Sequence, residues 1–145
     1  MGTTNFELIE MVQALKIPHF RGVIMKDEFK SLDKSLPNEC GIYNLNDSGE
    51  AGSHWCAWFK NENDWFHFCS FGGDPCLELR EYAKPNKITT HTFKLQQFED
   101  TCCGEYCLLV LYLCFYKKLS YYDVILSLYN LSKKEATATN NQESK

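Results

Sequence analysis

The sequence predicts a single α+β domain in which a small antiparallel sheet packs against one buried helix. The chain has 145 residues, a length typical of one domain with its own hydrophobic core. Several short runs alternate apolar and polar residues, as half-buried strands do, and lie between runs with helical spacing. The longest apolar run, roughly 106–116, is shorter than the roughly 20 residues that cross a bilayer, so it is expected to be part of a buried helix over 103–116.

The N-terminal part is predicted to contain one helix and two strands. Thr4 and Glu7 have the spacing of a capping box at the start of a helix over 4–16, and apolar residues follow at helical spacing. The other elements expected here are a strand at 20–25, a polar loop with a helical turn at 26–39, and a strand at 40–47.

A β-hairpin is predicted in the middle of the chain. The aromatic runs at 54–59 and 64–71 are separated by the four polar residues KNEN, which are expected to form the turn 60–63. With this turn, position 54 faces position 69. A residue that orients His54 from the neighbouring strand is therefore expected at Cys69.

The C-terminal half is predicted to be mainly helical. Ser120 and Asp123 cap its last helix. The polar segment 132–145 lacks apolar periodicity and is expected to be a disordered tail, which limits the domain to 1–131. The elements expected before the tail are a helix at 76–83, a strand at 87–94, the buried helix at 103–116 and a helix at 121–129.

Composition excludes several classes of partner. The net charge is −4 and no run of five or six basic residues occurs, which argues against a requirement for DNA and against binding to acidic membranes. No signal peptide is visible, so the eight cysteines are expected to be reduced thiols in the cytosol, the nucleus or a virion. The absence of a C-x-x-C motif argues against structural zinc, and no metal or other cofactor is expected.

Cys103 is the strongest candidate for a nucleophile. It lies at the start of the buried helix, where unpaired N–H groups and the helix dipole favour a thiolate. Cys102 flanks it outside the helix, whereas Cys107 and Cys114 lie within the apolar run and are expected to fill the core. Cys40 has a similar sequence context, ECG, but it opens a strand and gains nothing from a helix dipole.

A base for this thiol has to be one of four histidines. His54 is favoured because it begins a strand and is followed by Trp55, an aromatic residue that can shield a thiolate–imidazolium pair from water. His19 follows a proline in a loop, and His91 lies in an ordinary alternating strand with a solvated face.

Taken together, the runs GSHWCAWF, FHFCSFGGDP and CCGEYC, with a glutamine shortly before the last, resemble the adenovirus-protease (adenain) type of cysteine peptidase. The resemblance covers roughly 17–116. It implies a papain-like or adenain-like fold, shared with the proteases of SUMO and other ubiquitin-like proteins. It also implies a viral or virus-derived endopeptidase in the host nucleus, cytoplasm or virion. Its substrates would be precursors of structural and core proteins, and a peptide activator is possible.

The resemblance also implies roles for individual residues. His54 corresponds to the general base and Cys103 to the nucleophile. The oxyanion hole would combine the backbone N–H of Cys103 with a glutamine side chain. Gln96 has the spacing of the adenovirus type and is favoured, whereas the spacing of Gln97 is closer to that of the SUMO proteases.

The sequence departs from the family at the third catalytic position, where Cys69 replaces a carboxylate. A neutral thiol is a weak hydrogen-bond partner for an imidazolium, so reduced activity is expected. Asp74, in the following turn, is an alternative third member. Two other functions therefore stay open: a protease that removes SUMO or ubiquitin-like modifiers, and a non-catalytic relative that binds a partner.

Overall fold

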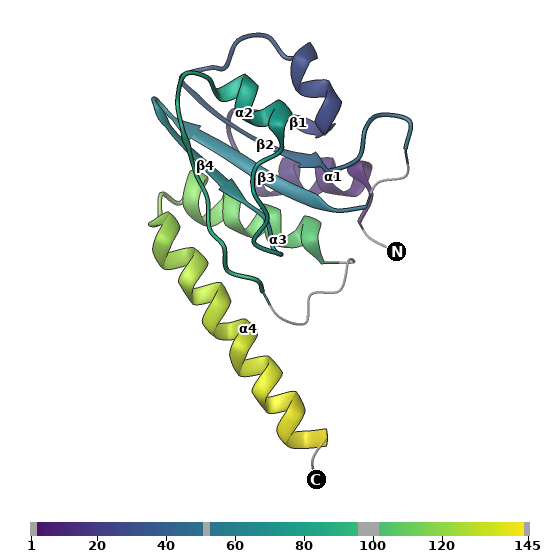
Figure 1. Ribbon diagram of the computed structural model, residues 1–145, viewed down its shortest axis with the longest axis vertical. Helices are drawn as coiled ribbons and strands as arrows, with labels where there is room; N and C mark the ends of the chain where they lie inside the picture. Colours follow the sequence, from purple (N-terminus) through teal and green to yellow (C-terminus); the bar gives the residue numbers. More distant parts are fainter. Residues whose placement is uncertain (1–2, 51–52, 96–101, 144–145) are drawn as a thin grey trace.

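The computed structural model describes residues 3–50, 53–95 and 102–143, with side chains up to residue 134 (Figure 1). Its centre is a five-stranded sheet in the order β1-β2-β3-β4-β5. The strands are β1 (Phe20–Met25), β2 (Asn38–Asn44), β3 (Trp55–Asn61), β4 (Asp64–Phe68) and β5 (Ile88–Thr89).

The sheet is mixed, which corrects the prediction of an antiparallel sheet. The pairs β2–β3 and β3–β4 are antiparallel, but β1 runs parallel to β2, and β4 runs parallel to β5. Both parallel pairs are joined by connections that contain a helix, η1 between β1 and β2 and α2 between β4 and β5, and both helices lie on the same face of the sheet. Such a crossover returns the chain to the same end of the sheet and makes the next strand parallel.

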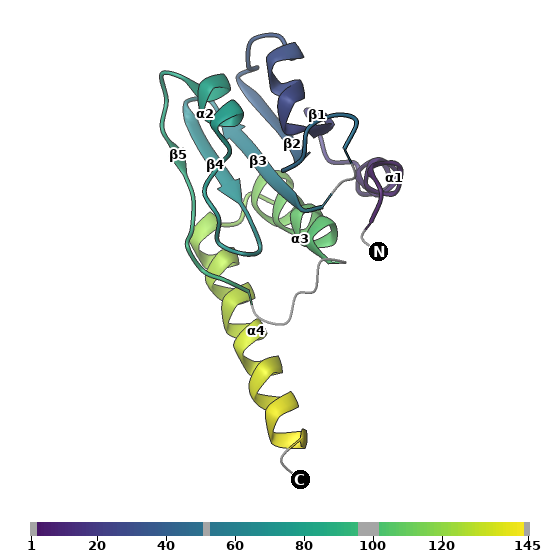
Figure 2. The same cartoon turned by 45° about the vertical axis from the view of Figure 1, so that its right-hand side comes forward.

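Helices cover both faces of the sheet (Figures 1 and 2). On one face, α1, α3 and η2 share a hydrophobic core with the start of α4, and on the other face η1 and α2 form a second core. The helical elements are α1 (Asn5–Leu15), the 3₁₀-helix η1 (Lys26–Ser31), α2 (Leu77–Ala83), α3 (Cys103–Val110), the π-helix η2 (Leu111–Tyr116) and α4 (Tyr121–Glu143).

Strand β3 shows how the sequence divides between these two cores. Trp55, Ala57 and Phe59 belong to the core beneath α3, whereas Cys56 and Trp58 belong to the core beneath α2. Successive side chains of a strand point to opposite faces, so this alternation follows directly from the sequence. All five side chains are buried, which makes β3 a central strand.

The hairpin is confirmed, but its predicted register is wrong by two residues. Asn61 pairs with Asp64, which leaves a two-residue turn in place of the predicted turn 60–63. Lys60 is part of β3 and pairs with Trp65. Its ammonium group donates a hydrogen bond to the hydroxyl of Ser35 at 2.9 Å and lies 5.1 Å from the centre of the Trp65 ring, so its polar end has partners within the fold.

Other local predictions are confirmed with changed boundaries. Both hydrogen bonds of the capping box between Thr4 and Glu7 are present at the start of α1. The predicted strand 87–94 is reduced to two residues in β5. The predicted buried helix 103–116 is present, although its second half is wound as the π-helix η2.

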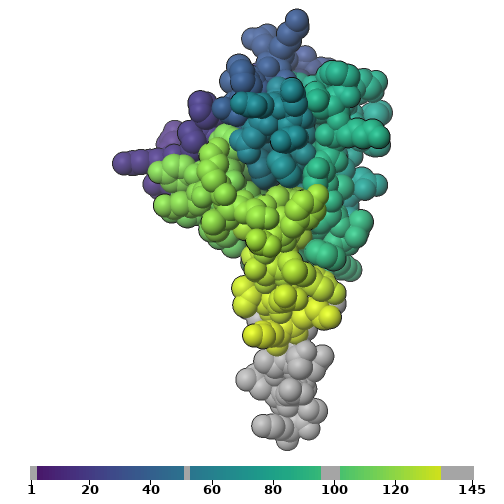
Figure 3. Space-filling model, turned by 90° about the vertical axis from the view of Figure 1, so that its left-hand side faces the viewer, coloured from purple at the N-terminus to yellow at the C-terminus, as the bar shows by residue number. Residues whose placement is uncertain are grey.

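The last helix, α4, differs most from the prediction. It continues to Glu143, through most of the segment 132–145 that was expected to be disordered, and it extends beyond the rest of the molecule (Figures 1 and 3). The run KKEA at 133–136 consists of good helix formers, so propensity extends the helix where no apolar periodicity does. Among the described residues, no helix is long and apolar enough to cross a membrane.

Candidate active site

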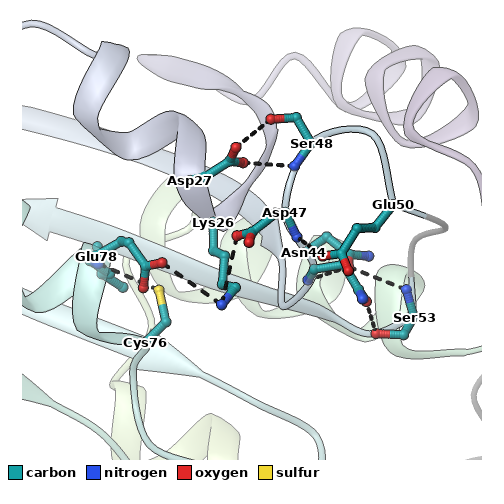
Figure 4. A network of polar contacts seen from close by, with 11 residues as sticks. Lys26, Asp27, Asn44, Asp47, Ser48, Glu50, Ser53, Cys76 and Glu78 are labelled. Carbon is teal, nitrogen blue, oxygen red and sulfur yellow. Dashed lines mark hydrogen bonds and ion pairs between the residues drawn. The ribbon is translucent and has the colours of Figure 1, made fainter.

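His54 follows a loop that is tied back to the end of β2 (Figure 4). The buried side-chain carbonyl of Asn44 accepts hydrogen bonds from the backbone N–H groups of Asn46, at 2.9 Å, and Ser53, at 3.2 Å. The backbone N–H of Leu45 donates to the carbonyl oxygen of His54 at 3.1 Å. The backbone of His54 is therefore held in place from both sides of the loop.

The outer part of this loop is anchored to η1 and α2 (Figure 4). The carboxylate of Asp27 accepts hydrogen bonds from the hydroxyl and the backbone N–H of Ser48, and these bonds lower its pKa. Lys26 lies 3.7 Å from Asp47 and 3.8 Å from Glu78. These ion pairs are partly exposed and each contributes little energy, so the loop is linked to η1 by several weak contacts together.

Cys103 is the first residue of α3 and lies beside the start of β3. Its sulfur accepts a hydrogen bond from the backbone N–H of Trp55, with 3.4 Å between N and Sγ. Gly104 permits a close approach of α1, because a Cβ atom there would lie only 2.9 Å from Cδ2 of Leu8. The predicted nucleophile is thus placed next to the residue that follows His54, although its side chain is only 2% exposed.

The His54 ring lies close to two sulfur atoms. Its Nε2 is 3.3 Å from Sγ of Cys69, and its Nδ1 is buried with no hydrogen-bond partner among the described residues. Burial opposes a charge on this ring, but its interactions with Cys103 and Cys69 outweigh burial and raise the pKa of His54 to about 9. The ring of Phe71 stacks on it with 4.5 Å between the ring centres. Residue 69 therefore contacts His54 as expected, even though the register behind that expectation was shifted.

The contacts of Cys69 favour its ionised form, whereas the sequence analysis treated it as a neutral thiol. A hydrogen bond from the Cys56 thiol is the main cause that lowers the pKa of Cys69 to about 3. Burial opposes this shift, while His54 and the backbone N–H of Gly73 add to it. The same contact raises the pKa of Cys56. The surroundings of the Cys69 sulfur thus favour its ionised form at the position where adenain-type peptidases have a carboxylate.

The other residues considered for the site are placed differently. Asp74 is exposed and makes no hydrogen bond or ion pair with His54, both being described residues. His19, which the sequence analysis did not favour as the base, is also exposed. His91 was expected on a solvated face, but it is buried and accepts a hydrogen bond from the backbone N–H of Cys69 at 3.4 Å. His91 thus supports the segment that carries Cys69, a role that the strand pattern did not reveal.

Gln96 and Gln97, the two candidates for the oxyanion hole, lie outside the described residues. The residue before them, Leu95, is buried, and its backbone N–H donates to the carbonyl oxygen of Ser70 at 2.9 Å. The last described residue before this gap therefore lies next to the segment that carries Cys69.

The remaining cysteines of the apolar run pack as expected. Cys107 and Cys114 are buried, and burial raises the pKa of both thiols, that of Cys114 to about 12. Cys102 is exposed at the helix start, and none of the eight cysteines is in a disulfide.

A group of possible metal ligands was missed by the sequence analysis. The ligand atoms of His54, Cys56 and Cys69 all lie within 4.8 Å of one another, and the three side chains are buried. A search for C-x-x-C motifs cannot find this group, because His54 directly precedes β3, Cys56 lies in β3, and Cys69 follows β4. The local signal was His-x-Cys at the start of β3, since residues two apart along an extended chain point to the same side.

Comparisons with known proteins support the fold. No protein-family model matches the chain, and no curated protein matches it. Among solved structures, the crystal structure of the selenomethionine form of ASFV pS273R protease matches with a TM-score of 0.64 and 17% sequence identity, over 90% of this chain. The chain spans 66% of the length of that protein. The two proteins share a fold, which agrees with the adenain-like fold that the sequence resemblance implied.

Proposed function

We propose that this protein is a cysteine endopeptidase with Cys103 as its nucleophile and His54 as its general base. The observation that carries the proposal is the position of the Cys103 sulfur at the first turn of α3, hydrogen-bonded to the backbone N–H of the residue after His54. The protease fold of the structural neighbour supports the same assignment.

In the proposed reaction, the sulfur of Cys103 attacks the carbonyl carbon of a peptide bond. His54 takes up the thiol proton and later passes it to the leaving amine. Since Nε2 faces Cys69, Nδ1 is the nitrogen available for this proton transfer. The backbone N–H of Cys103 would stabilise the oxyanion together with the side chain of Gln96 or Gln97.

Cys69 acts in this proposal as the residue that positions His54. Its sulfur lies within hydrogen-bond distance of Nε2, so it holds a proton on that nitrogen. The lone pair of Nδ1 is then available to accept the proton of Cys103. Which ring nitrogen of a histidine carries the proton is set by the bond that its other nitrogen makes. A sulfur at this position would thus replace the carboxylate of the family.

The proposed substrates are precursors of viral structural and core proteins, because the sequence resembles viral peptidases. The same resemblance places the enzyme in the nucleus or cytoplasm of an infected cell, or in the virion, with a peptide as a possible activator. Neither the charge balance nor the site supports a requirement for DNA.

The first test is hydrolysis of an unfolded protein such as reduced casein, followed by mass spectrometry of the products. Activity is expected in the native chain and should be lost in Cys103→Ser and His54→Ala, but kept in Cys114→Ala, which changes a buried cysteine outside the site. Equal activity in the native chain and in Cys103→Ser would contradict the proposal. A fluorogenic substrate made from the C-terminus of a modifier tests for a deconjugating protease in the same assay.

A second candidate is a non-catalytic relative that binds a partner. Two observations favour it: the side chain of Cys103 is only 2% exposed, and the third catalytic position has no carboxylate. Iodoacetamide distinguishes the two candidates. In an enzyme, Cys103 should react much faster than an ordinary thiol and lose this advantage in His54→Ala. In a binding protein, Cys103 should react slowly in both chains.

A further inference from the structure

One buried group beside His54 acts on the proposed mechanism only indirectly, through its hydrogen bond to Cys69. Cys56 belongs to the core beneath α2, together with Cys69, and its thiol has no part in proton transfer or nucleophilic attack. With His54 it completes the trio whose ligand atoms lie within 4.8 Å of one another. Two sulfurs and an imidazole nitrogen form a donor set that is typical of zinc sites.

The geometry of this trio is close to that of a tetrahedral zinc site. Zn–N bonds of about 2.0 Å and Zn–S bonds of about 2.3 Å place a nitrogen and a sulfur about 3.6 Å apart and two sulfurs about 3.8 Å apart. The observed distance between His54 Nε2 and Cys69 Sγ is 3.3 Å. Since no separation exceeds 4.8 Å, shifts of about 1 Å or less bring all three atoms to tetrahedral distances.

The surroundings also keep the ligands in place. The Phe71 ring stacks on His54, and the backbone N–H of Cys69 is hydrogen-bonded to His91. His54 directly precedes β3 and Cys56 is its second residue, so the two side chains are two positions apart along the chain and project to the same side. Such support limits the rearrangement that an incoming ion would require.

We propose that His54, Cys56 and Cys69 form a binding site for Zn²⁺, and that the bound ion reversibly blocks the general base. Only the second part rests on the proposed function. On binding, Cys56 releases its thiol proton to solvent and both sulfurs bind as thiolates, so their two negative charges balance the charge of the ion. A water molecule takes the fourth position, as in other sites with three protein ligands.

The bound ion blocks catalysis through the two nitrogens of one ring. A neutral imidazole that binds a metal through Nε2 carries its proton on Nδ1. His54 then has no lone pair on Nδ1 with which to accept the proton of Cys103. The ion also removes Cys69 from its contact with His54, so the positioning of the base is lost at the same time.

The ligand set predicts which ions bind. Thiolate and imidazole ligands select Zn²⁺ and its spectroscopic substitute Co²⁺, whereas Mg²⁺ and Ca²⁺ require oxygen ligands. Zn²⁺ in the micromolar range should therefore bind, and millimolar Mg²⁺ should have no effect. The main alternative is that the ion binds to the Cys103 sulfur and not to the Cys56 sulfur. A chain without the Cys103 sulfur distinguishes the two.

Binding is tested in Cys103→Ala, which has no nucleophile, so its result does not depend on catalysis. Co²⁺ should produce sulfur-to-cobalt charge-transfer absorption, and Zn²⁺ should displace it and raise the melting temperature. Adding Cys56→Ser should weaken binding by at least about 100-fold, because a hydroxyl is a poor zinc ligand. Cys114→Ala in the same background is the matched control and should bind as tightly as Cys103→Ala alone.

Circular dichroism of each chain shows whether it is folded, and Cys56→Ala provides a second variant if Cys56→Ser is not. The site is refuted if Cys103→Ala binds no Co²⁺, or if removal of the Cys56 sulfur leaves the affinity unchanged.

Inhibition is tested separately, as the ratio of casein hydrolysis with and without Zn²⁺ in each chain. Binding that depends on Cys56 in a protein without protease activity would support the metal site and refute the proposed function. Equal inhibition of the native chain and Cys56→Ser would place the inhibitory ion elsewhere.

Discussion

Replacement of Cys69 by alanine tests the most unusual feature of the proposed active site. The substitution removes the sulfur that lies 3.3 Å from Nε2 of His54 and leaves the rest of the site in place. Cys69 is only 3% exposed, so water cannot easily take over this contact. A hydrogen bond to a charged group contributes about 1.5–3 kcal/mol, and each 1.4 kcal/mol is a factor of ten, so kcat/KM should fall by about 10- to 150-fold.

The assay is the initial rate of casein hydrolysis at a fixed pH, with urea unfolding measured for each chain. Cys114→Ala is the matched control, because it removes the same sulfur from a side chain that is also 3% exposed. Cys114→Ala should lower the free energy of unfolding by about as much as Cys69→Ala does. Its kcat/KM should stay within about twofold of the native value, because the control changes packing only.

A second substitution at the same position sharpens this test. Cys69→Asp introduces a carboxylate, which can accept a hydrogen bond at about 2.8 Å. Its activity should equal or exceed that of the native chain. If Cys69→Ala hydrolyses casein as fast as Cys114→Ala, Cys69 does not position His54, and the reasoning is refuted. The same conclusion follows if Cys69→Asp is as slow as Cys69→Ala.

Three further predictions concern the core, the base and the metal. Gly41→Ala should lower the free energy of unfolding by about 1–3 kcal/mol, because the added Cβ would lie 2.2 Å from the fully buried ring of Trp58. Urea titrations should show that Trp58→Phe, added to Gly41→Ala, recovers part of this loss. His54→Ala should slow the alkylation of Cys103 by iodoacetamide at least about tenfold. His19→Ala, which changes an exposed histidine, should leave the rate unchanged. Equal rates in the two variants would show that His54 does not activate Cys103. Protein prepared in zinc-containing medium should gain casein-hydrolysing activity when a chelator is added. If a chain shown to contain zinc keeps the same activity after chelation, bound zinc does not block His54.

Much of the local structure could be predicted from the sequence because its causes are local. The capping box at Thr4, the start of α3 at Cys103 and the strands around His54 depend on neighbouring residues and on the period of the apolar pattern. The order of the motifs also implied the fold that the structural neighbour shares. Local pattern was a poor guide where a polar residue packs within a strand, as at Lys60, and where propensity alone extends a helix, as in α4.

The sequence by itself thus determined the main helices and strands, the candidate nucleophile and base, and the presence of a cysteine at position 69. Only the tertiary structure decided the directions of the outer strands, the register of the hairpin and the contacts that lower the pKa of Cys69. It also brought Cys56 to the same site as His54 and Cys69. The physical reason is that ionisation and metal coordination depend on distances of a few ångströms between atoms of different strands. A one-dimensional pattern specifies such distances only after the strands are paired.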